Sequence, residues 1–333
     1  MPHKLVIVGA AGHVNLVLDE LPQYPNVRFD AYAPSFDGED VSRYERFQGG
    51  NASPKAYSDW IQMLDTEEPD IVTVCGRYDL NGPIAIEAAR RDIHIISEKP
   101  AAQSLEAVDT LRQLVKEREL VYAIMLPMRY DPPFYTARRL VRWGVIGEPY
   151  LISAQKSYQW GQERPAWYAD PKKYGSTMTW VGIHAFDYAR WVADVDYTRV
   201  CAHHANLVHT ERPGCQDVAT VMAQLANGGS AVFRLDYLRP AGAPTHGDDR
   251  LRIAGSKGVL EICDRGTRLH LTTQAKDTPS WPLEHPERTL FGDFVAALEG
   301  EGKLLVPAEE AFDITAFAIK ATQAADNGGI VDV

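Results

Sequence analysis

The first hundred residues repeat one pattern, in which a short apolar run is followed by a stretch with helical spacing. The apolar runs occupy residues 5–8, 27–33, 71–74 and 93–96, and the helical stretches include residues 15–21 and 83–91. Runs this short and this apolar are typical of strands that are buried on both faces, as in parallel sheets covered by helices. The alternation therefore predicts an α/β fold with a doubly wound parallel sheet.

The second half of the chain has a different character. Strand-like composition appears at residues 151–158, 218–225, 230–237 and 251–253, and Asn227-Gly228 is a strong hairpin signal. Helical patterning returns at residues 290–298 and 308–325, and these helices could pack back toward the first half. Since 333 residues exceed the usual size of one domain, we expect two domains, residues 1–125 and residues 126–333.

Charge and cysteine content narrow the class of protein. The formal net charge of −11 disfavours nucleic acid and anionic membranes as partners, because no global positive field attracts them. The four cysteines are scattered and form no CxxC pair, so neither a disulfide framework nor a zinc ribbon is expected. No apolar run approaches the roughly 20 residues that span a bilayer. We therefore expect a cytoplasmic protein without a membrane partner.

The turn after the first apolar run, Gly9-Ala10-Ala11-Gly12-His13-Val14, is similar to the glycine-rich fingerprint of dinucleotide-binding folds. Only Gly9 keeps its place, because Ala11 and Val14 stand where the fingerprint has glycines. A tight turn without a ligand is the alternative. We assign Gly9, Ala11, Gly12 and His13 to cofactor contacts, because a strand precedes the turn and a helix follows it.

The residues after the second run bear on the choice of cofactor. In NAD-binding folds an acidic residue near this point holds the ribose hydroxyls, and Asp37 comes slightly late for that role. Ser35 with Arg43 or Arg46 could instead receive the 2′-phosphate of NADP. The sequence therefore predicts NAD or NADP and leaves the choice open.

A lysine follows the fourth run, at the strand ends where open parallel sheets bind ligands. The Lys99 ammonium could donate to a substrate hydroxyl and to the cofactor ribose, whereas the alternative is an ordinary surface lysine. We assign Glu98 and Lys99 to cofactor contacts.

The stretch His94-Ile95-Ile96-Ser97-Glu98-Lys99-Pro100 resembles the strand and EKP motif of the Gfo/Idh/MocA oxidoreductases. Further landmarks of that family follow in order along nearly the whole chain. They are Arg129 in Pro127-Met128-Arg129-Tyr130, the turn Gly144-Val145-Ile146-Gly147-Glu148-Pro149, Gly182-Ile183-His184-Ala185-Phe186-Asp187, Cys215-Gln216-Asp217, Asn227-Gly228-Gly229 and Ala254-Gly255-Ser256-Lys257-Gly258.

The resemblance implies a Rossmann domain followed by an α+β domain whose large, mostly antiparallel sheet commonly mediates oligomerisation. It also implies that Lys99 and His184 are catalytic, with His184 as acid or base and Lys99 polarising the same oxygen. An imidazole suits this role because it ordinarily titrates near pH 6.5. The alternative is that His184 is a core residue whose ring nitrogens form hydrogen bonds within the protein and take no part in catalysis.

The chain departs from the family at Trp180, where many members carry an aspartate four residues before the histidine. An indole donates one hydrogen bond and accepts none, so Trp180 cannot serve as a base. It could offer an apolar face to a sugar ring or fill the core. Asp187 joins Trp180 and Arg129 among the candidate substrate contacts, although orienting nearby groups is the role we favour for Asp187.

An aromatic segment with amide and basic residues precedes the histidine. Its candidate substrate contacts are Tyr158, Trp160, Trp167 and Lys173. Aromatic faces cover the C–H side of a sugar while polar groups bond its hydroxyls, but such loops also pack on domains or across dimers. His203, His204 and His209 lack a completing cysteine pair, so no metal site is expected.

The sequence thus predicts an NAD(P)-dependent oxidoreductase that transfers a hydride to or from a sugar, an inositol or a related polyhydroxylated substrate. One alternative is a redox-neutral lyase or glycosidase that uses transient oxidation. Another is a dinucleotide- or sugar-binding protein without catalysis. A homodimer or homotetramer is expected, because an open sheet face needs cover.

Overall fold

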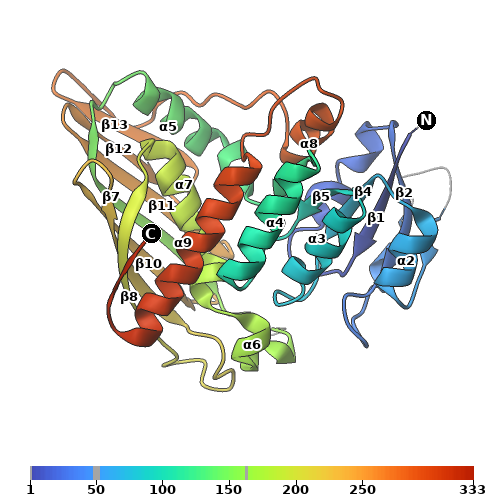
Figure 1. The fold of residues 1–333 in the computed structure, drawn as a ribbon. Coiled ribbons are helices and arrows are strands. Elements are labelled where there is room, and N and C mark those ends of the chain that lie inside the picture. The colour runs from blue at the N-terminus through green and yellow to red at the C-terminus, as the bar shows by residue number, and fades with distance from the viewer. Residues whose placement is uncertain (1, 48–52, 162–163) are drawn as a thin grey trace. The chain divides into compact units, whose positions relative to one another are not determined.

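The computed structural model describes residues 2–47, 53–161 and 164–333, which form two compact units (Figure 1). The first unit holds the residues up to Met125 together with Arg288–Thr315, and the second holds Leu126–Glu287 and Ala316–Val333. The segment 288–315, which the sequence analysis assigned to the second domain, clusters with the first unit. The assignment of separate functions to the two domains stays a prediction.

The first unit is built on a six-stranded parallel sheet in the order β3-β2-β1-β4-β5-β6. Its strands are β1 (His3–Val8), β2 (Val27–Ala33), β3 (Lys55–Ala56), β4 (Ile71–Val74), β5 (His94–Ser97) and β6 (Tyr122–Ile124). The four predicted apolar runs all form strands, and Leu5, Val6, Ile7 and Val8 are fully buried. The predicted doubly wound parallel sheet is therefore confirmed.

Helices and short connections complete the first unit. Its helices are α1 (Asn15–Leu18), α2 (Trp60–Glu67), α3 (Asn81–Arg90), α4 (Leu105–Glu117) and α8 (Leu290–Leu298). Helix α4 begins where the Ser104 side chain accepts a hydrogen bond from the Ala107 amide. The helix expected over residues 15–21 has a single turn, because Pro22 disfavours helical backbone at Leu21.

The second unit is built on a nine-stranded sheet in the order β14-β13-β12-β11-β7-β10-β9-β8-β15. Its strands are β7 (Pro149–Gln159), β8 (Tyr197–Ala205), β9 (Val218–Leu225), β10 (Ser230–Arg239), β11 (Gly247–Gly255), β12 (Gly258–Cys263), β13 (Arg268–Thr273), β14 (Asp277–Thr278) and β15 (Ile330–Asp332). Only β7 and β10 pair in parallel, so the predicted mostly antiparallel sheet is confirmed. The predicted hairpin at Asn227-Gly228 joins β9 to β10.

Helices pack against one face of this second sheet. They are α5 (Pro132–Arg142), which contacts β12 and β13, and α7 (Ile183–Ala193), which contacts β7 and β11. The short helix α6 (Pro171–Tyr174) contacts the helical turn Ala166–Ala169. Along β9 and β10 the residues alternate between buried and exposed, so the sheet has one core face and one open face. The boundary between the units falls inside α9 (Ala308–Asn327).

Candidate functional site

The predicted cofactor turn lies at the carboxyl end of β1, and its two glycines are required by their surroundings. Gly9 has φ +80° and Gly12 has φ +67°, a region that favours glycine. A Cβ atom on Gly9 would lie 2.4 Å from the Cys75 carbonyl oxygen, and one on Gly12 would lie 2.5 Å from the Glu98 side chain. The turn therefore packs tightly on the ends of β4 and β5. The Ala11 amide donates to the Cys75 carbonyl at 2.8 Å.

An acidic residue that sequence reasoning missed joins this turn to the end of β2. The Glu39 carboxylate accepts hydrogen bonds from the Ala10 amide at 3.0 Å, the Ser35 amide at 2.6 Å and the Ser35 hydroxyl at 2.7 Å. Asp37, a candidate contact of the cofactor ribose, is exposed, and the Arg43 guanidinium donates to the Asn15 side chain. The signal that could have identified Glu39 is an acidic residue in the loop after the second strand.

A chain of three ionisable side chains, of which Glu98 and Lys99 are buried and His13 is partly exposed, connects the turn to the predicted catalytic lysine. His13 Nδ1 lies 2.9 Å from Glu98 Oε1, and Lys99 Nζ lies 3.4 Å from the same oxygen. Burial alone would raise the pKa of Glu98, but the charges of His13 and Lys99 and the hydrogen bonds from His13 hold that pKa below its ordinary value. Glu98 therefore stays ionised and stabilises a positive charge on Lys99, which is 1% exposed.

The predicted residues of the second unit include a buried ion pair. His184 is the second residue of α7 and is buried, and Asp187 lies one turn further along the helix. The Arg129 Nη2 atom lies 2.5 Å from Asp187 Oδ1, and Arg129 Nε donates to both carboxylate oxygens at 3.1 Å. Such a pairing orients the Arg129 guanidinium, which is what a positioning role for Asp187 requires. Trp180, 7% exposed, lies in the wide helical turn Met178–Gly182 before α7.

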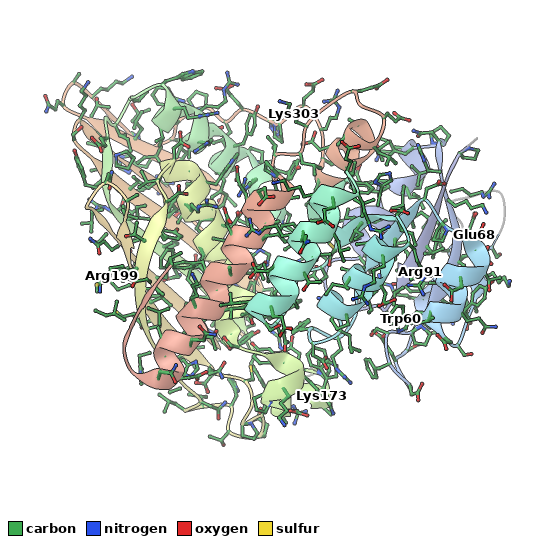
Figure 2. All side chains as sticks on the ribbon, viewed as in Figure 1. Trp60, Glu68, Arg91, Lys173, Arg199 and Lys303 are labelled. Atoms are coloured by element: carbon green, nitrogen blue, oxygen red, sulfur yellow. The ribbon has the colours of Figure 1, made fainter. Side chains whose placement is uncertain are left out.

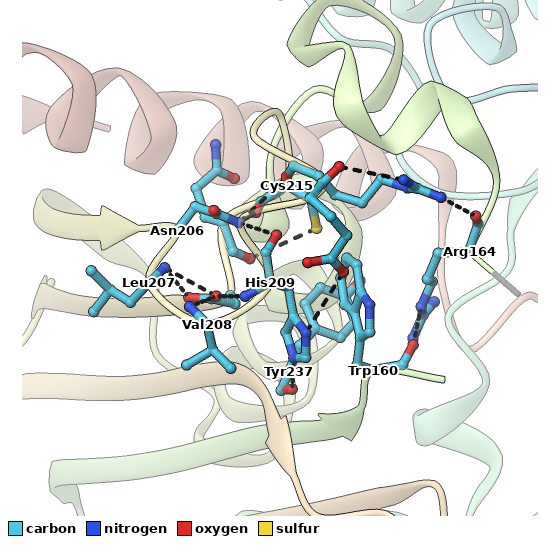
Figure 3. A network of polar contacts seen from close by, with 12 residues as sticks. Trp160, Arg164, Asn206, Leu207, Val208, His209, Cys215 and Tyr237 are labelled. Carbon is cyan, nitrogen blue, oxygen red and sulfur yellow. Dashed lines mark hydrogen bonds and ion pairs between the residues drawn. The ribbon is translucent and has the colours of Figure 1, made fainter. Parts of the chain in front are cut away.

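The aromatic segment forms stacked pairs with two histidines. The Tyr158 ring stacks on His246 with centroids 4.7 Å apart, and the Trp160 ring stacks on His209 at 4.3 Å and an interplanar angle of 9° (Figure 3). Trp167 contacts Tyr168 at a centroid distance of 4.7 Å. The indole of Trp160 borders a hollow of about 390 Å³ whose other lining residues include His209, Tyr237, Leu238 and Arg239. Residues 162–163 of this segment lie outside the described residues.

The segment around α6 carries the remaining predicted contact. Lys173 extends from α6 and is partly exposed, with its Nζ 3.5 Å from an Asp170 carboxylate oxygen (Figure 2). A loop between β8 and β9 supplies His209, whose Nε2 lies 3.1 Å from the Tyr237 carbonyl oxygen. Sequence reasoning did not identify His209 or Tyr237 as part of this region, because both come from distant strands and loops.

Lys99 and Glu98 belong to the first unit, whereas His184, Arg129 and the aromatic segment belong to the second. Among residues 2–47, 53–161 and 164–333, no group of three or more His, Cys, Asp or Glu side chains could hold a metal ion. No helix in the described part of the chain is long and apolar enough to cross a membrane.

The first unit has the features that a nicotinamide dinucleotide requires. Strand β1 lies between β2 and β4, so the direction of winding reverses at the carboxyl end of β1, where open parallel sheets bind nucleotides. Gly9 and Gly12 shape the turn at that end, and Glu39 places a carboxylate beside it. The residues present therefore fit a dinucleotide.

Two family profiles match the chain. "Oxidoreductase family, NAD-binding Rossmann fold" matches residues 38–125, and "GFO/IDH/MocA C-terminal domain" matches residues 134–261. A myo-inositol 2-dehydrogenase from Thermotoga maritima is 27% identical over 232 residues, which are 68% of this chain and 66% of that protein. The chain thus spans about two thirds of the length of this curated relative.

Solved structures agree with these matches. A protein from Thermotoga maritima described as a candidate oxidoreductase is 36% identical, with a TM-score of 0.93 over 99% of this chain and 100% of that chain. A levoglucosan dehydrogenase in complex with NADH has a TM-score of 0.83 at 18% identity, covering 100% of this chain and 99% of that chain. This second likeness shows a shared fold.

Proposed function

Because this chain belongs to the GFO/IDH/MocA family of NAD-binding oxidoreductases, we propose that it transfers a hydride between a nicotinamide dinucleotide and a sugar, an inositol or a related polyhydroxylated compound. The similar proteins include an inositol dehydrogenase and a levoglucosan dehydrogenase, whose named substrates carry several hydroxyl groups. These names are all of dehydrogenases or oxidoreductases, so they do not favour the redox-neutral and non-catalytic alternatives.

The observation that carries the proposal is the chain of contacts His13–Glu98–Lys99 in the first unit, in which Glu98 and Lys99 are buried. It fixes a cationic side chain at the carboxyl end of β5, next to the turn that would hold the pyrophosphate. When bound, the dinucleotide supplies the nicotinamide carbon that gives or takes the hydride. Gly9, Ala11, Gly12 and His13 would line its pyrophosphate, and Ser35 and Glu39 would lie nearer its adenosine ribose.

Lys99 would donate a hydrogen bond to the oxygen of the reacting carbon, because an ammonium has three donors and stabilises negative charge developing there. His184 would take the proton from that oxygen during oxidation and return it during reduction, which an imidazole can do near neutral pH. Arg129 would bind a substrate hydroxyl or acid group, and Asp187 would hold its guanidinium in place. Tyr158, Trp160, Trp167, Lys173 and Trp180 remain candidate substrate contacts.

The proposal is tested by substrate screening followed by substitution. The protein is mixed with NAD⁺ or NADP⁺ and a panel of sugars, inositols and sugar acids, and reduction is followed at 340 nm. With the best substrate, Lys99→Ala and His184→Ala should each lower kcat by about 10²- to 10⁴-fold, the usual contribution of a positioned acid–base group. Cofactor affinity should change far less.

Two variants serve as controls. Lys116→Ala removes an exposed lysine from α4 and should leave kcat unchanged. Trp180→Phe keeps a smaller aromatic ring and loses one hydrogen-bond donor, and loss of that hydrogen bond should cost only about 1 kcal/mol. Folded Lys99→Ala and His184→Ala proteins with near-native kcat would refute the assigned roles, and absence of net reduction with every substrate would refute the dehydrogenase assignment.

A further inference from the structure

The loop after β2 turns back so that one carboxylate bridges two parts of the proposed cofactor site. Glu39 Oε1 accepts from the Ala10 amide at 3.0 Å, inside the glycine turn. Glu39 Oε2 accepts from the Ser35 amide at 2.6 Å and the Ser35 hydroxyl at 2.7 Å, just beyond the end of β2. The negative charge is therefore fixed at the carboxyl ends of β1 and β2.

The basic residues near this carboxylate have other partners. The Arg43 guanidinium donates to the Asn15 side chain and lies over the Tyr44 ring. The Arg77 guanidinium forms a two-point ion pair with Asp79, with distances of 2.6 and 2.9 Å, and lies over the Phe36 ring. Arg46 is exposed. In the described part of the chain Glu39 has no ion-pair partner, so its charge is not locally neutralised.

These contacts decide between the two arrangements that the sequence left open. Ser35, which could have received a 2′-phosphate together with an arginine, instead donates its hydroxyl to Glu39. A carboxylate accepts hydrogen bonds from the two hydroxyl groups of a ribose. It repels a 2′-phosphate, which carries one to two negative charges at neutral pH.

We infer that Glu39 selects NAD(H) over NADP(H), in the role for which Asp37 was one candidate in the sequence. This inference rests on the proposed function, because it concerns the cofactor of that reaction. Glu39 also keeps the glycine turn attached to the loop after β2, so it is both a structural and a selectivity residue. The structural role needs only oxygen atoms that accept the hydrogen bonds from Ala10 and Ser35. Discrimination against the 2′-phosphate of NADP needs the negative charge.

Direct binding separates these roles. Dissociation constants for NADH and NADPH are measured by fluorescence titration, without substrate, for the wild type, Glu39→Gln, Glu39→Asp and Asp40→Asn. The wild type should prefer NADH by about 100-fold, since juxtaposed like charges cost enough for a factor of this size. Glu39→Gln should reduce the preference below about 10-fold. Glu39→Asp retains the charge and should keep most of it.

Asp40→Asn is the matched control, because it removes one negative charge from the adjacent position of the same loop. Its carboxylate accepts from the Ser42 amide at 2.9 Å. This variant should keep the wild-type preference. Circular dichroism and thermal unfolding check that each variant is folded.

Several results would overturn the inference. These are equal affinity of the wild type for NADH and NADPH, an equal loss of preference in Glu39→Asp and Glu39→Gln, or a loss in Asp40→Asn as large as that in Glu39→Gln. The wild-type measurement can overturn the inference even when Glu39→Gln does not fold. Failure of the wild type to bind either dinucleotide would instead refute the proposed function.

Discussion

Asp131 is a single residue whose surroundings make the stability of the protein depend on pH. It precedes α5 as the cap residue and lies near Lys156 and Asp249, which are joined by a 2.8 Å contact. Burial raises the pKa of the Asp131 carboxyl to about 6; Lys156 opposes this shift and Asp249 adds to it. Ionised Asp131 is therefore less stable in the folded protein than in the unfolded chain.

We predict that Asp131→Asn stabilises the protein at pH 8 and has little effect near pH 4. A folded-state pKa above the unfolded value of 3.8 means that the Asp131 contribution is most favourable below pH 3.8 and is lost as pH rises through about 6. The gain at pH 8 should be about 1–3 kcal/mol, since each unit of pKa difference corresponds to about 1.4 kcal/mol and asparagine carries no charge to bury. Urea unfolding at both pH values measures it, and an equal gain at both would contradict this account.

Individual site residues could be predicted from the sequence when they belong to a known motif. Lys99 and His184 stand in recognisable motifs, and both are buried in the structure. Glu39 was missed because it lies beyond the position next to the strand end where the fingerprint has its acid, and only the conformation of the loop brings it back. The stacking of Trp160 on His209 was missed for a similar reason, since it joins two separate loops.

Among the larger elements, the loop between β8 and β9 is held by one carboxylate. Asp217 accepts hydrogen bonds from the amides of Leu207, Val208 and His209, with shortest distances of 2.9, 2.6 and 2.8 Å. Burial would raise the pKa of Asp217, but these amides hold it below its ordinary value. The carboxylate thereby fixes the segment that carries His209 against Trp160 (Figure 3).

We predict that Asp217→Asn lowers the free energy of unfolding by about 2–4 kcal/mol at pH 7, because hydrogen bonds to a charged group contribute about 1.5–3 kcal/mol each and the amide cannot replace them all. The lowered pKa means that the Asp217 contribution is present above the unfolded pKa and is lost as pH falls through the folded one. Tryptophan fluorescence during urea unfolding reports the change. Glu211→Gln, in the same loop, is the control and should have little effect.

Helices and strands could be predicted where the pattern of buried residues fits only one kind of secondary structure. Strands β1, β4 and β5 of the first sheet are largely buried on both faces, and β2 and β4 have the predicted ends. Strands β9 and β10 alternate between the core and open faces, and their composition and the Asn227-Gly228 turn between them identified them. The loop between β8 and β9 has no repeating pattern in its sequence. Its conformation depends on hydrogen bonds from the amides of residues 207–209 to the Asp217 carboxylate.

For the molecule as a whole, the open face of the second sheet carries apolar side chains. Strand register puts Leu151, Met222, Val232 and Ile330 on this face, and they are 49%, 51%, 37% and 62% exposed. Side chains of this kind gathered on one sheet face favour a protein partner. We propose that a second copy of the chain covers the face, in a homodimer or within a homotetramer.

Light scattering should therefore give a mass of two or four times 37.1 kDa at micromolar protein. Met222→Lys with Val232→Lys should lower that mass, because the two residues are cross-strand partners and the new charges would be buried at the interface. Trp143→Lys changes an exposed apolar residue at the end of α5 and should leave the mass unchanged. A monomeric wild type would contradict the proposal.

The return of residues 288–315 to the first unit determines when that unit can fold during synthesis. Phe291 packs edge-on against Tyr24 at 5.4 Å, and Phe312 contacts Tyr122 at 4.8 Å, so aromatic surface of the early chain is covered by late residues. A nascent chain that ends before residue 288 leaves this surface exposed to water. The first unit therefore has all its strands but lacks part of its aromatic cover while the ribosome translates the second sheet, and aggregation is a hazard until residues 288–315 emerge.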